Sequence, residues 1–195
     1  MKKLNLVICF LLPAYAVLAQ DNQSTVVQLG PVNASGVSQT GLANEAFVLQ
    51  IGTLNTSEVR QNGAHNQAET LQFGSTNDSE TEQLGNHNNA EVLQIGEENT
   101  AATFQTGNDN DSDIYQNGIA QTAIVVQNGN DNSSQISQLG IGNFGLTVQA
   151  GNNTFSDVEQ LGVMNNAETY QLGDHHSSNV SQQGFGNNSI VNQEN

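Results

Sequence analysis

Amide side chains recur along this chain at a fixed spacing, and the chemistry they offer is hydrogen bonding. A glutamine stands at every eleventh position from residue 28 to residue 193 without one miss. The series is Gln28, Gln39, Gln50, Gln61, Gln72, Gln83, Gln94, Gln105, Gln116, Gln127, Gln138, Gln149, Gln160, Gln171, Gln182 and Gln193. A buried amide without partners costs about 1–3 kcal/mol. When repeats stack in register, however, each amide can donate to the identical amide on one side and accept from the one on the other side. The spacing therefore predicts structural amide ladders.

Two further residue types recur with the same period, and each forms a column when the repeats are aligned. A glycine stands two residues after each glutamine that has a full unit following it, at Gly30, Gly41, Gly52, Gly63, Gly74, Gly85, Gly96, Gly107, Gly118, Gly129, Gly140, Gly151, Gly162, Gly173 and Gly184. An asparagine stands five residues after the glutamine in twelve of fifteen units, at Asn33, Asn44, Asn55, Asn66, Asn77, Asn88, Asn99, Asn110, Asn132, Asn143, Asn165 and Asn187. The exceptions are Gln121, Thr154 and His176. Glycine accepts positive φ at little cost and asparagine often does, so these residues predict a turn and a second amide ladder.

Short β-strands must position these columns. The residue four before each glutamine is always small, and the residue two before it is always β-branched. With the asparagine and glutamine, these columns fall on alternate positions, the period of two that sends side chains to one face of a strand. We expect 11-residue strand-turn units with strands of about five or six residues, two units to each 22-residue coil, and coils about 4.8 Å apart. The predicted fold is an all-β β-solenoid with two facing, parallel, in-register sheets, an amyloid-like cross-β arrangement.

Other residues that could do chemistry are weaker candidates. Paired acids such as Glu80 with Glu82 are more typical of a solvated face than of acid–base catalysis. Residues 107–110 and 129–132 place oxygen ligands in turns one coil apart, so a calcium-binding solenoid is an alternative. The calcium-binding repeat of secreted toxins has a nine-residue period, which this chain lacks. A catalytic solenoid needs convergent acids, bases or ligands that interrupt the repeat. We see no interruption, interpret the His175-His176 pair as exposed turn, and expect no enzymatic activity and no cofactor.

The first 19 residues predict a signal peptide, which leaves residues 20–195 as a single repeat domain. They combine a positively charged start, an apolar middle over residues 4–12 and small residues before Gln20. The apolar run is broken at Pro13, short of the roughly 20 residues that a membrane-spanning helix needs. The sequence therefore predicts secretion without direct membrane insertion.

Charge excludes several classes of partner. Removal of residues 1–19 would leave Arg60 as the one basic residue against 19 acidic groups, a formal balance of 1 − 19 = −18. Nucleic acids and anionic membranes bind clustered Lys and Arg, so neither is an expected partner. The same cleavage would remove Cys9, the one cysteine, and with it any disulfide. The mature domain must be held by packing and hydrogen bonds.

Both ends of the repeat array lack a recognisable cap. The repeat columns are already occupied at Asn22, Ser24 and Val26, and they are still occupied at Ser189, Val191 and Gln193. A soluble solenoid normally needs capping segments to cover its unpaired strand edges. Two different but complementary open ends predict a head-to-tail homopolymer that forms a filament instead of a ring. A capped or calcium-binding secreted adhesin is the alternative.

The pattern resembles the curlin repeat of curli subunits, Ser/Asn-x5-Gln-x-Gly-x-Gly-Asn-x5-Gln, over roughly residues 22 to 193. The family's second turn glycine is present here only at Gly142 and Gly186. The resemblance implies an extracellular, cell-surface amyloid fibre of a Gram-negative bacterium. It also implies a nucleator subunit and an outer-membrane secretion channel as partners, and roles in biofilm matrix, adhesion and surface colonisation. Regularity through the last repeat favours the major subunit over the nucleator subunit, which stays an alternative.

Overall fold

The computed structural model describes residues 21–195, which form β-strands joined by tight turns and contain no helix that could cross a membrane. The strands are β1 (Gln23–Leu29), β2 (Ala34–Leu42), β3 (Glu45–Thr53), β4 (Thr56–Ala64), β5 (Gln67–Ser75), β6 (Asp78–Asn86), β7 (Asn89–Glu97), β8 (Thr100–Asn108), β9 (Asp111–Ile119), β10 (Thr122–Asn130), β11 (Ser133–Ile141), β12 (Phe144–Ala150), β13 (Phe155–Val163), β14 (Asn166–Leu172), β15 (Ser177–Phe185) and β16 (Asn188–Glu194). The predicted all-β class is confirmed. The predicted signal peptide lies outside the described residues.

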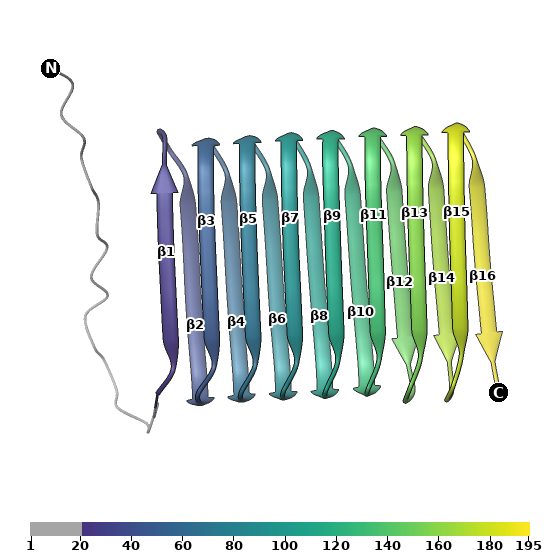
Figure 1. The fold of residues 1–195 in the computed structure, drawn as a ribbon, viewed down its shortest axis with the longest axis horizontal. Helices are drawn as coiled ribbons and strands as arrows, with labels where there is room; N and C mark the ends of the chain where they lie inside the picture. The colour runs from purple at the N-terminus through teal and green to yellow at the C-terminus, as the bar shows by residue number, and fades with distance from the viewer. Residues whose placement is uncertain (1–20) are drawn as a thin grey trace, which may run out of the picture.

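The strands build two eight-stranded parallel sheets that face each other. Odd-numbered strands form one sheet and even-numbered strands the other, so successive strands alternate between the two layers in Figure 1. Each strand pairs with the strand one coil later in a register of 22 residues, as Gln50 with Gln72 and Gly52 with Gly74. Strands β1 and β2 lie at one end of the stack and β15 and β16 at the other. The predicted β-solenoid with 22-residue coils is confirmed.

The strands are longer than expected. They run for seven or nine residues instead of five or six, and in the nine-residue strands pairing continues past the glutamine through the glycine and the residue after it. Gly74 has φ +125° and still pairs in register with Gly96 on the next coil. Every coil bends at the same place, so stacked backbones stay parallel even where the chain departs from ordinary strand geometry.

The interior is narrow and is filled by the alternate, inward-facing positions of each strand. Its apolar part consists of the small and β-branched columns, with Val48, Val92 and Ile136 all fully buried. Each such aliphatic side chain contributes roughly 1.5–3 kcal/mol on burial. The remaining interior is polar, and glutamines such as Gln50 and Gln72 are as completely buried as the valines.

A left-handed residue makes each turn between the two sheets. The position four residues after the column glutamine has φ between 52° and 62° in thirteen turns that carry a side chain there, and Gly142 and Gly186 occupy it in two others. A left-handed backbone costs roughly 1–2 kcal/mol for a residue other than glycine, and β-branched residues suffer most. Val32 and Thr76 are the β-branched residues at this position.

Thr76→Gly should therefore stabilise the solenoid by about 0.5–1 kcal/mol, since relief of strain at φ 58° exceeds the entropy that glycine loses on folding. The midpoint of urea unfolding measures the change. Thr56→Gly, at the first residue of β4, is the control and should destabilise by a similar amount. Equal losses in both variants would show that the turn holds no strain.

Candidate assembly site

The column glutamines form two continuous ladders, one in each sheet. Along each ladder the amide Nε2 donates to the Oε1 of the glutamine one coil later, at 2.7–3.0 Å. One ladder runs from Gln28 to Gln182 and the other from Gln39 to Gln193. All of these amides therefore point their donors in one direction along the stack.

From Gln39 to Gln193, the second hydrogen of each column glutamine amide crosses to the facing sheet. Gln50 Nε2 donates to the backbone carbonyl of Ala34 at 3.0 Å, and Gln72 Nε2 donates to that of Thr56 at 2.8 Å. In the other ladder, Gln39 Nε2 donates in the same way to the backbone carbonyl of Gln23 at 2.9 Å. Each glutamine thus ties its own sheet to the other sheet. Sequence reasoning missed this role. The signal it could have used is the constant separation of 16 residues between each glutamine and its backbone acceptor in the facing sheet.

The column asparagines form ladders of opposite direction. Asn66 Nδ2 donates to Asn44 Oδ1 at 3.0 Å, and the backbone N–H of Asn66 donates to the same oxygen at 3.0 Å. Asn66 Nδ2 also donates to the carbonyl of Gly85 at 2.8 Å, which lies in the turn one coil later. Ten of the twelve predicted asparagines are buried, Asn33 is half-buried and Asn187 is exposed. The amide-to-amide bonds of the glutamine and asparagine ladders therefore run in opposite directions along the molecule.

The column glycines let successive coils approach closely. A Cβ built on Gly96 would lie 1.9 Å from the carbonyl oxygen of Gly118, one coil later, and Gly52 and Gly74 have the same relation. Gly184 is different, because no coil follows it within the described residues, and its Cβ would meet only Asn187 Nδ2 at 3.5 Å. The glycine column is a requirement of stacking as well as of turn geometry.

Three residues interrupt the asparagine column, and one of them leaves a bonding defect. Gln121 is fully buried and its Oε1 has no hydrogen-bond partner, although its Nε2 donates to the carbonyl of Gly140 at 2.8 Å. Thr154 instead joins the ladder through its hydroxyl, which donates to Asn132 Oδ1 at 2.7 Å. His176 Nε2 lies 3.1 Å from the carbonyl of Leu172 at the end of the column.

Gln121→Asn should stabilise the fold by about 1 kcal/mol, because an asparagine would donate to Asn99 and accept from the backbone N–H of Asn143, as the regular members do. Chemical unfolding of both chains measures the gain. Thr154→Asn is the matched control and should gain less, because Thr154 already donates to the ladder. A loss of stability in Gln121→Asn would mean that the longer side chain is needed at this turn.

Core side chains on the outermost strands are covered to different degrees: those of β1 are exposed, those of β2 and β16 are partly buried, and Val180 on β15 is only 5% exposed. Val26 on β1 is 44% exposed, whereas Val48, one coil later in the same column, is fully buried. Val191 on β16 is partly buried at the other end. All four outermost strands carry the inward triplet Ser, Val, Gln: Ser24, Val26 and Gln28; Ser35, Val37 and Gln39; Ser178, Val180 and Gln182; Ser189, Val191 and Gln193. The two ends therefore present the same side chains in the same order.

The two ends also present complementary hydrogen-bonding groups. At the β1–β2 end, the Oε1 atoms of Gln28 and Gln39 accept nothing within residues 21–195, and Asn22 Nδ2 is buried without a partner. At the β15–β16 end, Gln182 and Gln193 each donate one hydrogen to a backbone carbonyl and have a second one to give. Unused acceptors at one end thus match unused donors at the other.

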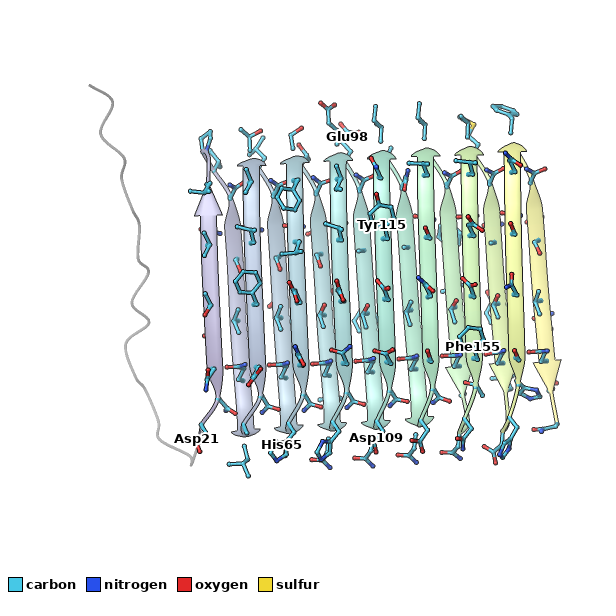
Figure 2. All side chains as sticks on the ribbon, in the orientation of Figure 1. Asp21, His65, Glu98, Asp109, Tyr115 and Phe155 are labelled. Atoms are coloured by element: carbon cyan, nitrogen blue, oxygen red, sulfur yellow. The ribbon has the colours of Figure 1, made fainter. Side chains whose placement is uncertain are left out.

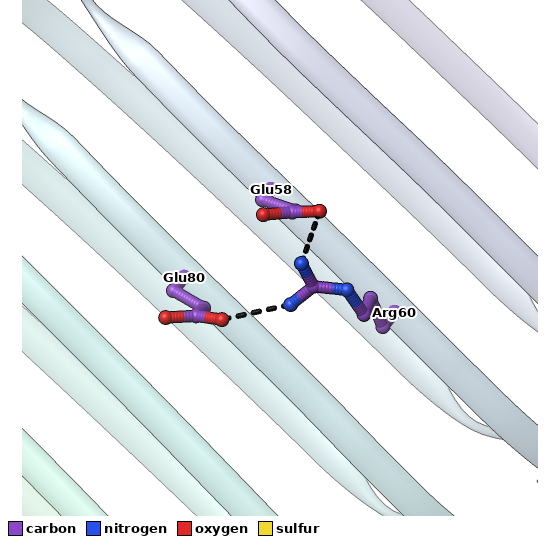
Figure 3. A network of polar contacts seen from close by, with 3 residues as sticks. All are labelled: Glu58, Arg60 and Glu80. Atoms are coloured by element: carbon purple, nitrogen blue, oxygen red, sulfur yellow. Dashed lines mark hydrogen bonds and ion pairs between the residues drawn. The ribbon is translucent and has the colours of Figure 1, made fainter.

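Carboxylates lie on the outer faces of the sheets. The acid row, defined as Glu69, Glu91 and Asp113, occupies one column on β5, β7 and β9. Burial raises the pKa of Asp113, and the neighbouring Glu91 and Asp111 raise it further. On the other sheet Arg60 lies between two carboxylates and pairs with Glu58 and, at 2.8 Å, with Glu80 (Figure 3). This exposed pairing relieves repulsion locally and adds little stability.

Asp113→Asn should stabilise the protein at pH 7. A pKa raised in the folded state means that the fold favours the protonated acid, so wild-type stability falls as pH rises through that pKa. The advantage of the variant should shrink as pH falls toward 4, which unfolding curves across a pH series measure. Gln135→Asn, which changes the neighbour of Asp113 one coil later and removes no carboxyl group, should keep the wild-type pH dependence. An identical dependence in both variants would contradict this assignment.

The turns carry polar and charged residues along both edges of the solenoid. Figure 2 shows Asp21, His65 and Asp109 along one edge and Glu98 along the opposite edge. The rings of His65 and His87 stack with their centroids 5.0 Å apart. Among residues 21–195 no three His, Cys, Asp or Glu side chains come together as metal ligands would, including those in the turns considered for calcium.

Comparison with known families adds one match. The family model described as curlin associated repeat matches the chain twice, over residues 85–118 and 107–140. These residues run from the end of β6 to β11, in the middle of the stack. No curated protein matches the chain significantly.

Proposed function

The chain belongs to the curlin family, and we propose that it is the self-polymerising structural subunit of an extracellular, curli-type amyloid fibre. The observation that carries this proposal is the pair of open, complementary strand edges at β1–β2 and β15–β16. An uncovered strand edge is a template for pairing with another chain. Here the other chain is a second copy.

Head-to-tail stacking would continue every feature of the interior across the subunit boundary. Eight whole coils separate the ends, so β15 would pair with β1 of the next subunit and β16 with β2, and each sheet would stay one sheet. Val180 would then cover Val26, and Gln182 would donate to Gln28. The contact is heterologous and does not close on itself, which produces a filament.

The direction of the amide ladders supports one polarity. In a head-to-tail contact the free Nε2 hydrogens of Gln182 and Gln193 meet the free Oε1 atoms of Gln28 and Gln39. Two β1–β2 ends placed together would set acceptor against acceptor. Unpaired buried groups of this kind cost about 1–3 kcal/mol each. The fibre we propose is therefore polar, with two different growing ends.

The biological setting follows from family membership and the leader sequence. We propose that residues 1–19 are a signal peptide and that residues 20–195 form one repeat domain without caps. The domain would leave the cell through an outer-membrane channel, polymerise on a nucleator subunit and serve in biofilm matrix, adhesion and surface colonisation. The role is structural, so no catalytic residue, cofactor or metal is assigned.

Incubation of the purified 20–195 chain tests the proposal. The expected result is unbranched filaments by electron microscopy, with a diffraction spacing of about 4.8 Å along the filament axis. Preformed filament fragments should shorten the lag before growth. A chain that stays monomeric for days at high concentration would support a capped adhesin instead, and a chain that grows only when a second subunit is added would support a role that depends on a nucleator.

A further inference from the structure

The outer face of the odd-numbered sheet carries a contiguous apolar surface. The leucine face, as we call it, consists of two in-register rows on β1, β3, β5 and β7: Val27, Leu49, Leu71 and Leu93 in one row, and Leu29, Ile51, Phe73 and Ile95 in the other. Leu29 is 46% and Ile51 36% exposed, and the inner members are half-buried by their neighbours alone. Nothing within residues 21–195 covers this face.

Polar residues border most of the leucine face, whereas Phe47 extends the apolar surface on β3. The acid row lies along one side, and Thr53 and Ser75 lie beyond the glycines on the other. At β9 the rows change to Tyr115 and Asn117. An apolar patch with a polar rim has the make-up of an interaction site, and stacking of subunits would repeat this patch along a filament.

We propose that the leucine face joins two filaments of this same chain side by side, an inference that rests on the fibre proposed above. Four strands at about 4.8 Å and two rows along the strand give an area of about 270 Å² for each subunit. A stable pair of proteins buries about 800 Å² on each partner. Two monomers would therefore not pair through this face, whereas ten subunits in a filament present about 2,700 Å² and bind multivalently.

A second filament is the partner whose apolar patches match this face along its whole length. The patch recurs once in every subunit, about 38 Å apart for eight coils. A filament of the same subunits has the same repeat, so every patch meets a patch. A two-fold axis parallel to the filaments sets one row of the leucine face over the other, as in dry paired sheets. It also places Glu69 opposite Ser75 instead of against another Glu69, and Glu91 opposite Glu97 at the solvated rim.

The test compares two double variants that remove apolar surface without changing charge. Leu71→Asn with Leu93→Asn empties the centre of the leucine face. Val126→Asn with Val148→Asn replaces valine by asparagine in the corresponding column of the even-numbered sheet, which carries its own apolar patch around Phe104, Ile124 and Leu146. Electron microscopy of filaments at equal mass measures the fraction lying side by side, and growth curves measure elongation.

The expected result is at least a tenfold fall in paired filaments for the leucine-face variant, with elongation within about twofold of wild type. Pairing of wild-type filaments should increase with salt, because salt screens the acidic rims. Paired filaments that persist in the leucine-face variant, or that disappear only in the Val126/Val148 variant, would overturn the proposal. Wild-type filaments that stay single would also overturn the pairing proposal, but they would not contradict the proposed fibre. A wild-type protein that forms no filaments would refute the proposed fibre itself.

Discussion

Val26→Asp should abolish fibre elongation while leaving the folded monomer intact. Val26 is 44% exposed at the open edge, so a carboxylate there is solvated in the monomer. In the proposed fibre the same side chain lies between Val48 of its own chain and Val180 of the preceding subunit, in a column that is fully buried elsewhere. Burying an unpaired charge costs several kcal/mol. A cost of about 3 kcal/mol already lowers the association constant by more than 100-fold.

The control is one residue away. Val27→Asp makes the identical change at a position that is 38% exposed but points outward, away from the interior. We expect it to elongate within a fewfold of wild type. Growth seeded with wild-type filaments measures both rates, and circular dichroism shows whether each monomer is folded. Equal elongation by the two variants would mean that the β1 edge is not buried during growth.

Gly96→Ala should destabilise the solenoid by at least about 3 kcal/mol. The added Cβ would lie 1.9 Å from the carbonyl oxygen of Gly118 and 2.9 Å from its carbonyl carbon. Neither atom can move without opening the pairing of β7 with β9. The residue also has φ +122°, which side chains rarely adopt. Unpacking a coil in the centre of the stack removes neighbour interactions on which repeat proteins depend.

Gly36→Ala provides the comparison within the same protein. Gly36 points outward from β2, and its Cβ would meet nothing within 4 Å. We expect no loss of stability, and a gain of up to about 1 kcal/mol from reduced entropy of the unfolded chain. Urea midpoints of the two variants measure the difference. Similar stability in both would show that coils are not as closely stacked as the glycine column indicates.

The fold could be predicted because the repeat fixes it. Strict alternation of asparagine, small, β-branched and glutamine columns defines which side of each strand faces inward, and the eleven-residue period defines how often a strand recurs. Strand length was underestimated, since the sequence does not show that pairing passes through a glycine at positive φ, as it does at Gly74. The left-handed position at Val32 and Thr76 was equally hidden, because neither residue type favours that conformation.

The hydrogen-bonding pattern of the amides and the outer faces of the sheets could not be predicted from the sequence alone. Stacking of identical amides follows from the spacing, but the second bond from Gln50 to Ala34 depends on how closely the two sheets face each other. The opposite directions of the glutamine and asparagine ladders depend on amide orientation, which sequence does not record. The leucine face is visible in sequence only after odd and even units are assigned to separate sheets, since Leu71 and Leu93 then become neighbours.

The spacing between identical residues of neighbouring subunits tests the central claim most directly. The substitution Gln135→Cys introduces a cysteine for a spin label at an exposed, outward position on β11. Pulsed electron paramagnetic resonance then measures the distance between labels in filaments. Head-to-tail stacking of eight coils predicts about 38 Å between nearest labels along a filament. A label-to-label spacing of about 5 Å, as when identical segments of different chains lie directly over one another, would contradict the solenoid fibre.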